Sequence, residues 1–600
     1  MPDQGRRNPA YTRSALSPGQ RAKYLLFTVA WLATTIYFWS WWLKPDHNIG
    51  TVRLVIVSLC IGWVYLMQLY FVVLLQFARV PSCAPPKPGQ FRVAMIVTKT
   101  PSEPFAVARR TLEGMLAQNY PHDTWLADED PSDETIAWCA ENNVRISCRK
   151  GDPEYAQPTW PRRRRCKEGN LAYFYDHWGY DDYDIVSQFD TDHRPEPGYL
   201  EEILRPFCDP GVGYVSAPSI CSYNADESWA ARARLHTEAA FHGVLQTGFA
   251  GAMAPMCIGS HYAVRTLALE DAGGLGPELS EDHSTTMLIS AKGWRGVHAI
   301  DAIAYGDGPA NASDLVTQEF QWSRSLLSLL LQHSGRYLEA MPFRLQFQFV
   351  FCQMWYPVFA LCMATLYVLP ILALSFDMRF AAVTYPAFIA HSAPTMLVLI
   401  GFAYAMRADR LLRPLDARIL SLDKGLFVCL QWPWVLWGCI MAVIDKLTGS
   451  FVDFRVTPKG DAARRAIPKK VLNVYIALAL GCFAPVFLTH GISSARGFYL
   501  LSTLNGLVYT LIVITIAAQY IRENGGFRME QFRKAGYSIL ASASLVAVLL
   551  GAVTFRGAES LFALSIGLEP FRLARAEYAV SGAGAGGQET IFYRFDPGWN

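Results

Sequence analysis

Two carboxylates that stand two residues apart close an apolar run near the middle of the chain, in the stretch Phe189-Asp190-Thr191-Asp192-His193. Residues two apart in a β-strand point to the same face, so Asp190 and Asp192 are predicted to hold one divalent cation together. Mg²⁺ commonly takes one or two carboxylates and completes its shell with phosphate oxygens and water. A solvated loop produces the same short pattern by chance, so this feature alone indicates only a candidate metal site.

Two further acidic clusters lie in the same region. Residues 125–130 read Trp-Leu-Ala-Asp-Glu-Asp, and residues 280–283 read Ser-Glu-Asp-His after a glycine-rich turn at 272–276. Loops at the carboxyl ends of strands form the ligand crevice of parallel sheets, so acids in such loops can meet at one place. The sequence therefore predicts one acid-rich site that binds a metal and a phosphorylated ligand.

An α/β domain over residues 91–335 is expected to position these acids. Short apolar runs bounded by turn residues are typical of buried strands, and the segments between them have helical periodicity. Alternating strands and helices favour a largely parallel sheet. The strands are expected at residues 93–97, 185–189 and 212–217, and two of the helices at 105–118 and 199–207.

The rest of the chain has the composition of a membrane protein. Apolar residues make up 52% and charged residues 17%, against roughly 25% charge in soluble domains. A helix needs ~20 apolar residues to cross a hydrocarbon core of ~30 Å. The formal net charge of +2 does not indicate a nucleic-acid partner. Runs of the required length lie at residues 24–43, 54–77, 349–376, 387–406, 471–491, 498–521 and 535–555.

Basic residues around these runs predict their orientation. Five basic side chains precede the first run and two follow it, which places the N-terminus and the domain at 91–335 in the cytoplasm. An eighth apolar run, at 425–444, is rich in Trp and lies between basic stretches at 407–418 and 446–470. If it were a span, one of those stretches would lie outside, so we interpret it as an interfacial helix.

The apolar runs divide the chain into parts that are expected to lie in the cytoplasm, in an inner or plasma membrane, or on its outer side. The tail contains a Gly/Ala-rich stretch at 581–587, which is either a partner-binding arm or disordered. The parts are a cytoplasmic N-terminus with two spans (1–90), the cytoplasmic α/β domain (91–335), two spans with interfacial helices (336–445), a cytoplasmic loop (446–470), three spans (471–555) and an extracytoplasmic tail (556–600).

Several motifs that follow one another along residues 91–470 resemble the processive family 2 glycosyltransferases, which include cellulose, curdlan, chitin and hyaluronan synthases. The agreement in order is more specific than any one motif. Glu129 and Asp130 depart from the family pattern, which has Asp and Gly there. The similar stretches are 128–135 (family pattern D-D-G-S-x-D-x-T), 167–171 (K-A-G-N-L), 190–195 (D-x-D-H followed by Pro), 257–260 (F-C-G-S), 281–282 (the E-D of T-E-D) and 318–322 (Q-x-x-R-W).

This resemblance implies a GT-A-like α/β domain inserted in a helical transmembrane bundle, a UDP-sugar donor and a Mg²⁺ or Mn²⁺ ion. Asp282 is implied as the catalytic base, with Glu281 beside it, and Asp190 and Asp192 as the metal ligands. The donor-binding residues implied are Thr98, Glu103, Asp128, Lys167, Asp190 and Gln318. The acceptor-binding residues implied are Cys257, Gly259, Ser260 and Trp322.

The Q-x-x-R-W stretch departs from the family at one position, where Gln321 replaces the Arg. In the family this Arg helps to hold the donor diphosphate, so its loss removes a charged contact. Arg324 is the nearby candidate to replace it as a donor-binding residue. Weak turnover or a different donor geometry is the alternative expectation.

A second basic stretch, Phe454-Arg455-Val456-Thr457-Pro458-Lys459, resembles the F-x-V-T-x-K gating loop of cellulose and related β-glucan synthases. It adds Thr457 and Lys459 to the implied donor-binding residues and favours UDP-glucose as the donor. The alternative is a basic loop held by anionic lipid.

The sequence thus predicts an inverting, membrane-embedded synthase that polymerises glucose from UDP-glucose into a β-glucan and exports it through its transmembrane helices. The linkage stays open between β-1,3, mixed and β-1,4. The expected partners are the growing chain, membrane lipid, and accessory export proteins or a second copy of the chain. Two alternatives remain: a non-processive transferase that adds single sugars to a lipid or oligosaccharide, and a low-activity scaffold subunit of an export complex.

Overall fold

The computed structural model describes residues 11–277, 280–449, 469–524, 529–566, 572–579 and 589–596. Thr457, Lys459 and the stretch at 581–587 lie outside these residues. The chain forms two compact units. The first comprises Met1–Leu25, Tyr70–Ala360 and Tyr404–Arg465, and the second comprises Leu26–Leu69, Leu361–Ala403 and Ala466–Asn600.

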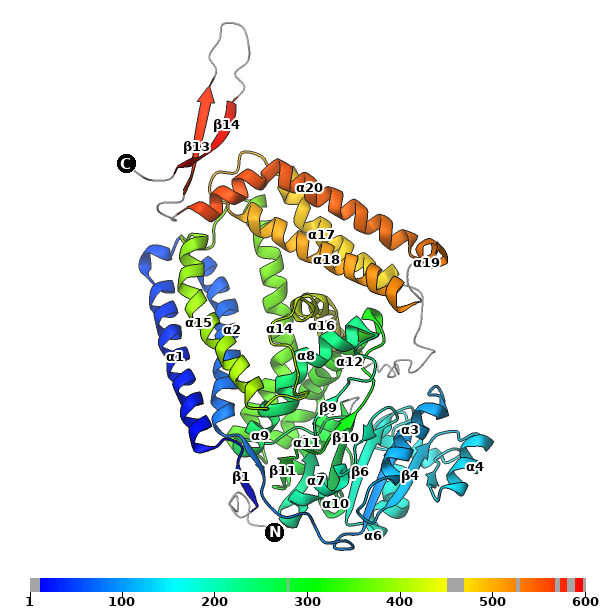
Figure 1. Cartoon of the computed structure of the whole chain (residues 1–600). Helices are drawn as coiled ribbons and strands as arrows, with labels where there is room; N and C mark the ends of the chain where they lie inside the picture. Colours follow the sequence, from blue (N-terminus) through cyan, green and yellow to red (C-terminus); the bar gives the residue numbers. More distant parts are fainter. Residues whose placement is uncertain are drawn as a thin grey trace. The chain divides into compact units, whose positions relative to one another are not determined.

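The first unit is built on a mixed sheet of seven strands in the order β11-β8-β10-β6-β3-β4-β5 (Figure 1). Every neighbouring pair is parallel except the two pairs made by β10, which is antiparallel to β6 and β8. The predicted strands at 93–97, 185–189 and 212–217 are confirmed within a residue or two. The strands are β3 (Val93–Lys99), β4 (Asp123–Asp128), β5 (Arg145–Ser147), β6 (Ile185–Asp190), β8 (Val212–Ser216), β10 (His261–Arg265) and β11 (Arg295–His298).

Apolar side chains cover both faces of this sheet, as the continuous apolar runs predict. On one face Val93, Met95 and Val97 pack with the helices α3 (Phe105–Leu116) and α7 (Tyr199–Leu204). On the other face Ala94 and Ile96 pack with residues of α5 (Lys167–Phe174), α10 (Thr266–Ala272) and α11 (Glu281–Ala291). The helices therefore enclose the sheet in three layers.

The sheet register brings strand ends together at one edge. Thr98 of β3 lies opposite Asp190 of β6, and Lys99 lies opposite Asp128 of β4. Three of the predicted site residues therefore end neighbouring strands. A three-stranded sheet made of β7 (Arg194–Pro195), β12 (Ala304–Tyr305) and β9 (Ser219–Ile220) follows β6 in the same unit.

Two longer helices of the first unit pack against each other, α12 (Ala312–Leu329) and α16 (Leu422–Thr448). Asn311 caps α12, since its side chain accepts hydrogen bonds from the N–H groups of the second and third residues after it. Gly438 of α16 lies directly on Ser323 and on the carbonyl of Phe320, where a Cβ would overlap both. A glycine at this position therefore permits the close approach of the two helices.

The remaining elements of the first unit are short. They include β1 (Thr12–Ser14), which pairs antiparallel with β2 (Arg79–Pro81). The others are α4 (Asp133–Glu141), α6 (Tyr180–Asp182), α8 (Trp229–Thr237), α9 (Gln246–Ala252) and α13 (Gly335–Leu338).

Long apolar helices dominate the second unit. Within the described residues, seven helices of the whole chain are long and apolar enough to cross a membrane, six of which coincide with the predicted spans. The seven are α2 (Thr51–Gln76), α14 (Phe343–Ser375), α15 (Tyr385–Ala408), α16, α17 (Lys469–Leu488), α18 (Phe498–Glu523) and α20 (Gly536–Ser565), and a short helix α19 (Met529–Lys534) precedes α20.

The set differs from the predicted one at two helices. The helix α1 (Pro18–Trp42) has 25 residues but is not among the seven, because Trp, Tyr, Thr and Ser make up much of it and keep its mean hydropathy low. The helix α16, expected at the interface, qualifies by length and composition. It also buries one side, including Leu426, Leu430 and Val435, within the first unit. Its interfacial position stays a prediction.

The tail contains structure that the sequence interpretation missed. The strands β13 (Arg572–Ala579) and β14 (Glu589–Asp596) pair antiparallel over eight residues each. The predicted fold class, a GT-A-like α/β domain with a mostly parallel sheet joined to transmembrane helices, is confirmed by the sheet and by the apolar helices.

Candidate active site

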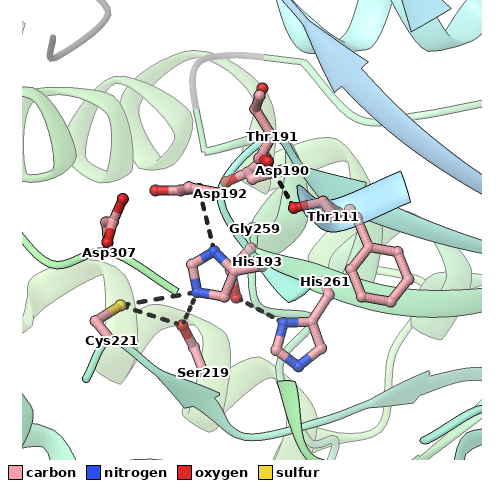
Figure 2. A network of polar contacts seen from close by, with 12 residues as sticks. Thr111, Asp190, Thr191, Asp192, His193, Ser219, Cys221, Gly259, His261 and Asp307 are labelled. Atoms are coloured by element: carbon pink, nitrogen blue, oxygen red, sulfur yellow. Dashed lines mark hydrogen bonds and ion pairs between the residues drawn. The ribbon is translucent and has the colours of Figure 1, made fainter. Parts of the chain in front are cut away.

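The strand β6 ends at Asp190, and the next two residues form a turn that fixes the two acids (Figure 2). The Thr191 hydroxyl lies 2.6 Å from the carbonyl oxygen of Thr98 and 2.9 Å from the carboxylate of Glu103, and its one proton can be donated to either. These contacts bend the chain out of the sheet. The expectation that Asp190 and Asp192 share one strand face is therefore wrong, because only Asp190 lies in the strand. The two acids are still adjacent, on either side of the turn.

A buried histidine holds the second acid of the turn (Figure 2). His193 Nδ1 lies 3.2 Å from the carboxylate of Asp192, and its Nε2 lies 3.2 Å from Ser219 Oγ and 3.8 Å from Cys221 Sγ. Burial acts to lower the pKa of His193, but the hydrogen bonds to Asp192 and Cys221 raise it to about 10. These contacts fix the ring beside Asp192.

Lys167 joins the first acid to the third cluster. It is the first residue of α5, and its ammonium lies 2.7 Å from Asp190 Oδ1 and 3.6 Å from Glu281 Oε1. It also donates to the carbonyl of Gly259. One cation thus connects β6, α11 and the turn before β10, which are far apart in the sequence.

The predicted base lies at the same place. Asp282 Oδ2 accepts a 2.6 Å hydrogen bond from the N–H of Gly259, and Oδ1 accepts one of 2.7 Å from the N–H of His283. Burial raises the pKa of Asp282, an effect that these two bonds and the charge of Lys167 oppose. A carboxylate with a raised pKa is a better proton acceptor at neutral pH than an ordinary aspartate.

Glu281 is the neighbour of Asp282 at the start of α11 and is more deeply buried. Its Oε2 accepts the hydroxyl of Tyr262 at 2.8 Å. Burial raises its pKa to about 7, against the opposing charge of Lys167 and with a further contribution from Asp282. We therefore assign it to positioning Lys167 and α11, whereas Asp282 faces the turn of Gly259.

The charges of this cluster are unbalanced. Lys167 is the cation shared by Asp190, Glu281 and Asp282, and the side chain of Asp190 is 35% exposed. Within the described ranges, no group of three or more His, Cys, Asp or Glu residues could cage a metal. The partly exposed carboxylate of Asp190 and the adjacent Asp192 nevertheless fit a Mg²⁺ or Mn²⁺ ion that takes its other ligands from a diphosphate and water.

The predicted nucleotide-binding residues are less accessible. Asp128 is fully buried and pairs with Lys99 at 3.0 Å. The carboxylate of Glu103 accepts hydrogen bonds from Thr100 and Thr191, and the hydroxyl of Thr98 donates to a backbone carbonyl at 3.3 Å. These residues fix the loop after β3 in the structure, and their contact with a nucleotide stays a prediction. Lys99 was missed because no motif marks it.

The turn before β10 contributes mainly its backbone. Cys257 is buried among apolar side chains on one face of the sheet, and its N–H donates to Thr286 at 2.9 Å. The carbonyl of Ser260 accepts the N–H of Asp190 at 2.8 Å, and Gly259 bonds to Asp282 as described. A Cβ at Gly259 would stand 3.1 Å from Asp282, so the absence of a side chain there keeps the base accessible.

Beside the Q-x-x-R-W stretch on α12 lies a guanidinium group that the sequence did not indicate. Arg234 of α8 lies over the ring of Trp322 at 4.0 Å, donates to Gln318, and pairs with Glu238 (3.0 Å) and Glu319 (3.4 Å). Arg234 is 84 residues from Gln318 in the chain, so no local pattern could have revealed it.

The residue proposed to replace the motif Arg has a different partner. Arg324 Nε donates to Asp445 of α16 at 2.6 Å, and its Nη2 lies close to the same oxygen. Gln321 is buried. Arg324 therefore ties α12 to α16 in the structure, and its contact with a donor stays a prediction.

Comparisons with known proteins find relatives of part of this chain. Residues 185–406 match the family described as glycosyl transferase family group 2. Cellulose synthase 1 of Komagataeibacter xylinus is 25% identical over 310 residues, which are 50% of this chain and 19% of that protein. The UDP-forming cellulose synthase catalytic subunit of Xanthomonas axonopodis pv. citri (strain 306) is 24% identical over 328 residues, 52% of this chain and 43% of that protein.

Among solved structures, a mannosyltransferase from Pyrobaculum calidifontis in complex with GDP-Man and Mn²⁺ aligns with a TM-score of 0.40 and 16% identity, over 72% of this chain and 99% of that one. The chain spans less than half the length of the two cellulose synthases that it matches.

A mixed sheet with acids at the ends of its strands gives the first unit a GT-A-like fold, and the chain also has helices long and apolar enough to cross a membrane. More narrowly, residues 185–406 carry the match to glycosyl transferase family group 2, and about half of the chain is similar in sequence to cellulose synthases.

Proposed function

We propose that the chain is a processive, inverting β-glucan synthase that uses UDP-glucose. The observation that carries the proposal is the cluster of Asp282, Lys167 and Asp190 around the backbone of Gly259. It combines a base, a cation and a candidate metal ligand within one buried site that opens at Asp190. Such a site suits a reaction in which a proton leaves an acceptor hydroxyl while a diphosphate leaves the donor.

Asp282 acts in this mechanism as the general base. Its carboxylate accepts the proton of an acceptor hydroxyl, the hydroxyl oxygen forms a bond with the anomeric carbon, and the bond from that carbon to the diphosphate oxygen breaks. Attack opposite the leaving group converts an α-linked donor into a β-linked product. The N–H of Gly259 holds the carboxylate in place, and a base of this kind typically contributes 10²–10⁴-fold to the rate.

The remaining charges of the cluster serve the leaving group. Asp190 and Asp192 would hold a Mg²⁺ or Mn²⁺ ion, which offsets the charge that develops on the departing diphosphate. Lys167 lies next to Asp190 and can donate to a diphosphate oxygen without losing contact with Glu281. His193 keeps Asp192 oriented by donating to it.

The donor and the product are inferred from the motifs. The stretch containing Thr457 and Lys459 resembles the gating loop of β-glucan synthases, and the relatives are cellulose synthases, one of which is named as UDP-forming. Trp322 offers a ring on which an acceptor sugar can stack, although Arg234 already lies over that ring. Export of the product through the apolar helices of the same chain completes the proposal.

A second candidate is a non-processive transferase that adds one sugar to a lipid or oligosaccharide. Gln321 in place of the family Arg favours it, as does the ion pair between Arg324 and Asp445, which engages the nearest substitute. A donor diphosphate held by fewer charged contacts would leave more often between additions.

One experiment separates these functions. The purified chain in lipid nanodiscs receives radiolabelled UDP-glucose with Mg²⁺, and the product is sized and digested with linkage-specific glucanases. A long polymer that one glucanase degrades supports the synthase and identifies its linkage. Products of one or two added sugars would replace the proposal by the second candidate, and no transfer from any UDP-sugar tested would reject both.

A further inference from the structure

A cavity in the first unit lies apart from the acid cluster of the candidate active site. It has a volume of about 900 Å³ and is bounded by α8, by the loop that follows α15, and by residues of β1, β2, β9 and β12. None of Lys167, Asp190, Glu281 and Asp282 lines it. Neither the motifs nor the proposed mechanism assigns it a role.

Three guanidinium groups point to the kind of ligand that this cavity takes. Arg13, Arg410 and Arg418 line it and are exposed. Among the described residues, none of the three forms a hydrogen bond or ion pair through its side chain. Two of the four lining acids are already engaged: Asp409 pairs with Lys23 at 2.6 Å, and Asp301 pairs with Arg413 at 2.7 Å.

The charge balance at the cavity is consequently positive. Asp226 and Asp416 are the other lining acids, against the three exposed guanidiniums and Arg232, whose own partner is Asp423 at 3.4 Å. The pKa of the lining residue His236 is lowered, first by burial and then by the nearby basic groups, including the Arg418 guanidinium. His236 is therefore neutral at pH 7 and adds no charge of its own.

The loop that carries two of these groups is held rigidly. Arg413 is 8% exposed and donates to the carbonyls of Ile300, Arg410 and Leu412, in addition to its ion pair with Asp301. Arg410 has a φ of 60°, a left-handed backbone that costs free energy for a residue with a side chain. The bond from Arg413 to the carbonyl of Arg410 stabilises that backbone, so the fold maintains a strained residue at the cavity rim.

The cavity wall also has an apolar part, and its position relates it to the membrane helices. Ile220, Ile300 and Leu411 are buried lining residues. Arg13 precedes α1 by five residues, and Arg410 follows the candidate span α15 by two. Both groups thus stand where apolar helices end, at the predicted cytoplasmic surface, where anionic lipid head groups concentrate.

We propose that this cavity binds a phosphate-bearing anion, with Arg13, Arg410 and Arg418 as its charged contacts. The shared chemistry is a phosphodiester or phosphomonoester with an apolar part that can lie on Ile300 and Leu411. The source is either the head group of an anionic phospholipid or a soluble phosphorylated compound. Guanidinium groups suit either because they bind phosphate oxygens with two parallel hydrogen bonds.

The cavity also contacts the helix that reaches the active site. Arg232, Leu235 and His236 of α8 line it, while Arg234 on another side of α8 contacts Trp322 and Gln318. A ligand that stabilises α8 is therefore expected to raise the transferase activity. Activity thus provides a second readout besides binding.

The test compares the full chain with an Arg410→Ala/Arg418→Ala variant and with an Arg336→Ala/Arg344→Ala control, which removes two exposed arginines outside the cavity. Binding of phosphatidylglycerol to detergent-purified protein is measured by native mass spectrometry, with phosphatidylcholine as the neutral lipid. We expect the cavity variant to lose about tenfold in phosphatidylglycerol affinity and the control to change by less than about twofold.

A competition with inorganic phosphate and inorganic diphosphate distinguishes the sources. Displacement of phosphatidylglycerol only by other anionic lipids indicates a lipid site, and displacement at micromolar phosphate or diphosphate indicates a soluble ligand. Equal phosphatidylglycerol binding by the cavity variant and the control would overturn the proposal, as would binding of no phosphate compound by the wild-type chain. Thermal unfolding at the wild-type temperature confirms that each variant is folded.

Discussion

Two charged clusters of the first unit differ in how their charges are balanced. Around Lys167 one ammonium serves three carboxylates, and one of these, Asp190, is 35% exposed at the side chain. Around Trp322 one guanidinium, that of Arg234, serves Glu238 and Glu319. The side chains of Arg234 and Glu319 are only 5% and 3% exposed, whereas that of Glu238 is 29% exposed.

The comparison indicates which of the two clusters can bind a ligand. A buried charge is stable only when it is paired, so the closed cluster of Arg234 has little capacity for an incoming anion or cation. The open cluster retains an excess of negative charge, which a divalent cation can neutralise. We therefore assign the chemistry to the first cluster and the support of Trp322 and Gln318 to the second.

Asp282→Asn is expected to have the largest effect, because it removes the base from the open cluster while preserving its shape. UDP release from UDP-glucose should fall by at least about a hundredfold, and binding of UDP should stay close to that of the wild type. Asp271→Asn, at an exposed acid of α10, is the matched control and should retain activity. Loss of UDP binding in Asp282→Asn would mean that Asp282 belongs to the donor site instead.

Chelation tests the excess negative charge of the same cluster. EDTA should abolish UDP release, and added Mg²⁺ or Mn²⁺ should restore it. Asp190→Asn should weaken Mn²⁺-dependent binding of UDP about tenfold or more, because it removes a candidate ligand and the partner of Lys167. Full activity in EDTA would show that the cluster works without a divalent cation.

Arg234→Lys tests the closed cluster. Lysine keeps the charge but loses the stack on Trp322 and most of the hydrogen bonds, since the two residues are not equivalent at stacked sites. We expect about a tenfold loss of polymer synthesis, expressed mainly as shorter product. Arg109→Lys, an exposed residue of α3, should behave as the wild type. If Arg234→Lys makes polymer of normal length, Arg234 does not position Trp322 for the acceptor.

The smallest expected effect is a pH-dependent change of stability in the closed cluster. Burial raises the pKa of Glu319 to about 7, against the charge of Arg234. Between its ordinary pKa of about 4.3 and about 7, the native state holds a proton that the unfolded state has lost. Stability therefore falls as pH rises through this window, and Glu319 destabilises the native state most above it.

Glu319→Gln removes this dependence. The melting temperature of the variant minus that of the wild type should be a few degrees higher at pH 8 than at pH 5. Measurement by differential scanning fluorimetry in detergent suffices. A difference that is the same at both pH values would mean that Glu319 is ionised in the native state throughout.

Much of the α/β domain could be predicted from local patterns. The apolar runs at 93–97 and 185–189 became β3 and β6, because strands that are buried on both faces need apolar residues at every position. The acids that follow such strands were located correctly, since the carboxyl ends of parallel strands lie at one edge of the sheet. The apolar helices could be predicted from length and hydropathy, because a helix that crosses the lipid core needs ~20 apolar residues.

Other features depended on contacts between distant parts of the chain. Thr191 bends the chain after Asp190 because its hydroxyl reaches Thr98 and Glu103, which an isolated D-x-D pattern does not indicate. The exclusion of Cys257 from the site surface and the ion pair of Arg324 with Asp445 likewise required the packed structure. The strand pairing in the tail lay outside any motif.

The sequence by itself thus determined the class of protein, the strands that end in acids and the identity of Asp282 as the candidate base. Only the tertiary structure decided that Lys167 joins Asp190 to Glu281, that Arg234 lies on Trp322, and that Arg324 pairs with Asp445. The physical reason is that periodicity and composition report how each segment meets solvent, lipid or core. The pairing of a buried charge depends instead on which residues, however remote in the chain, come within about 4 Å of it.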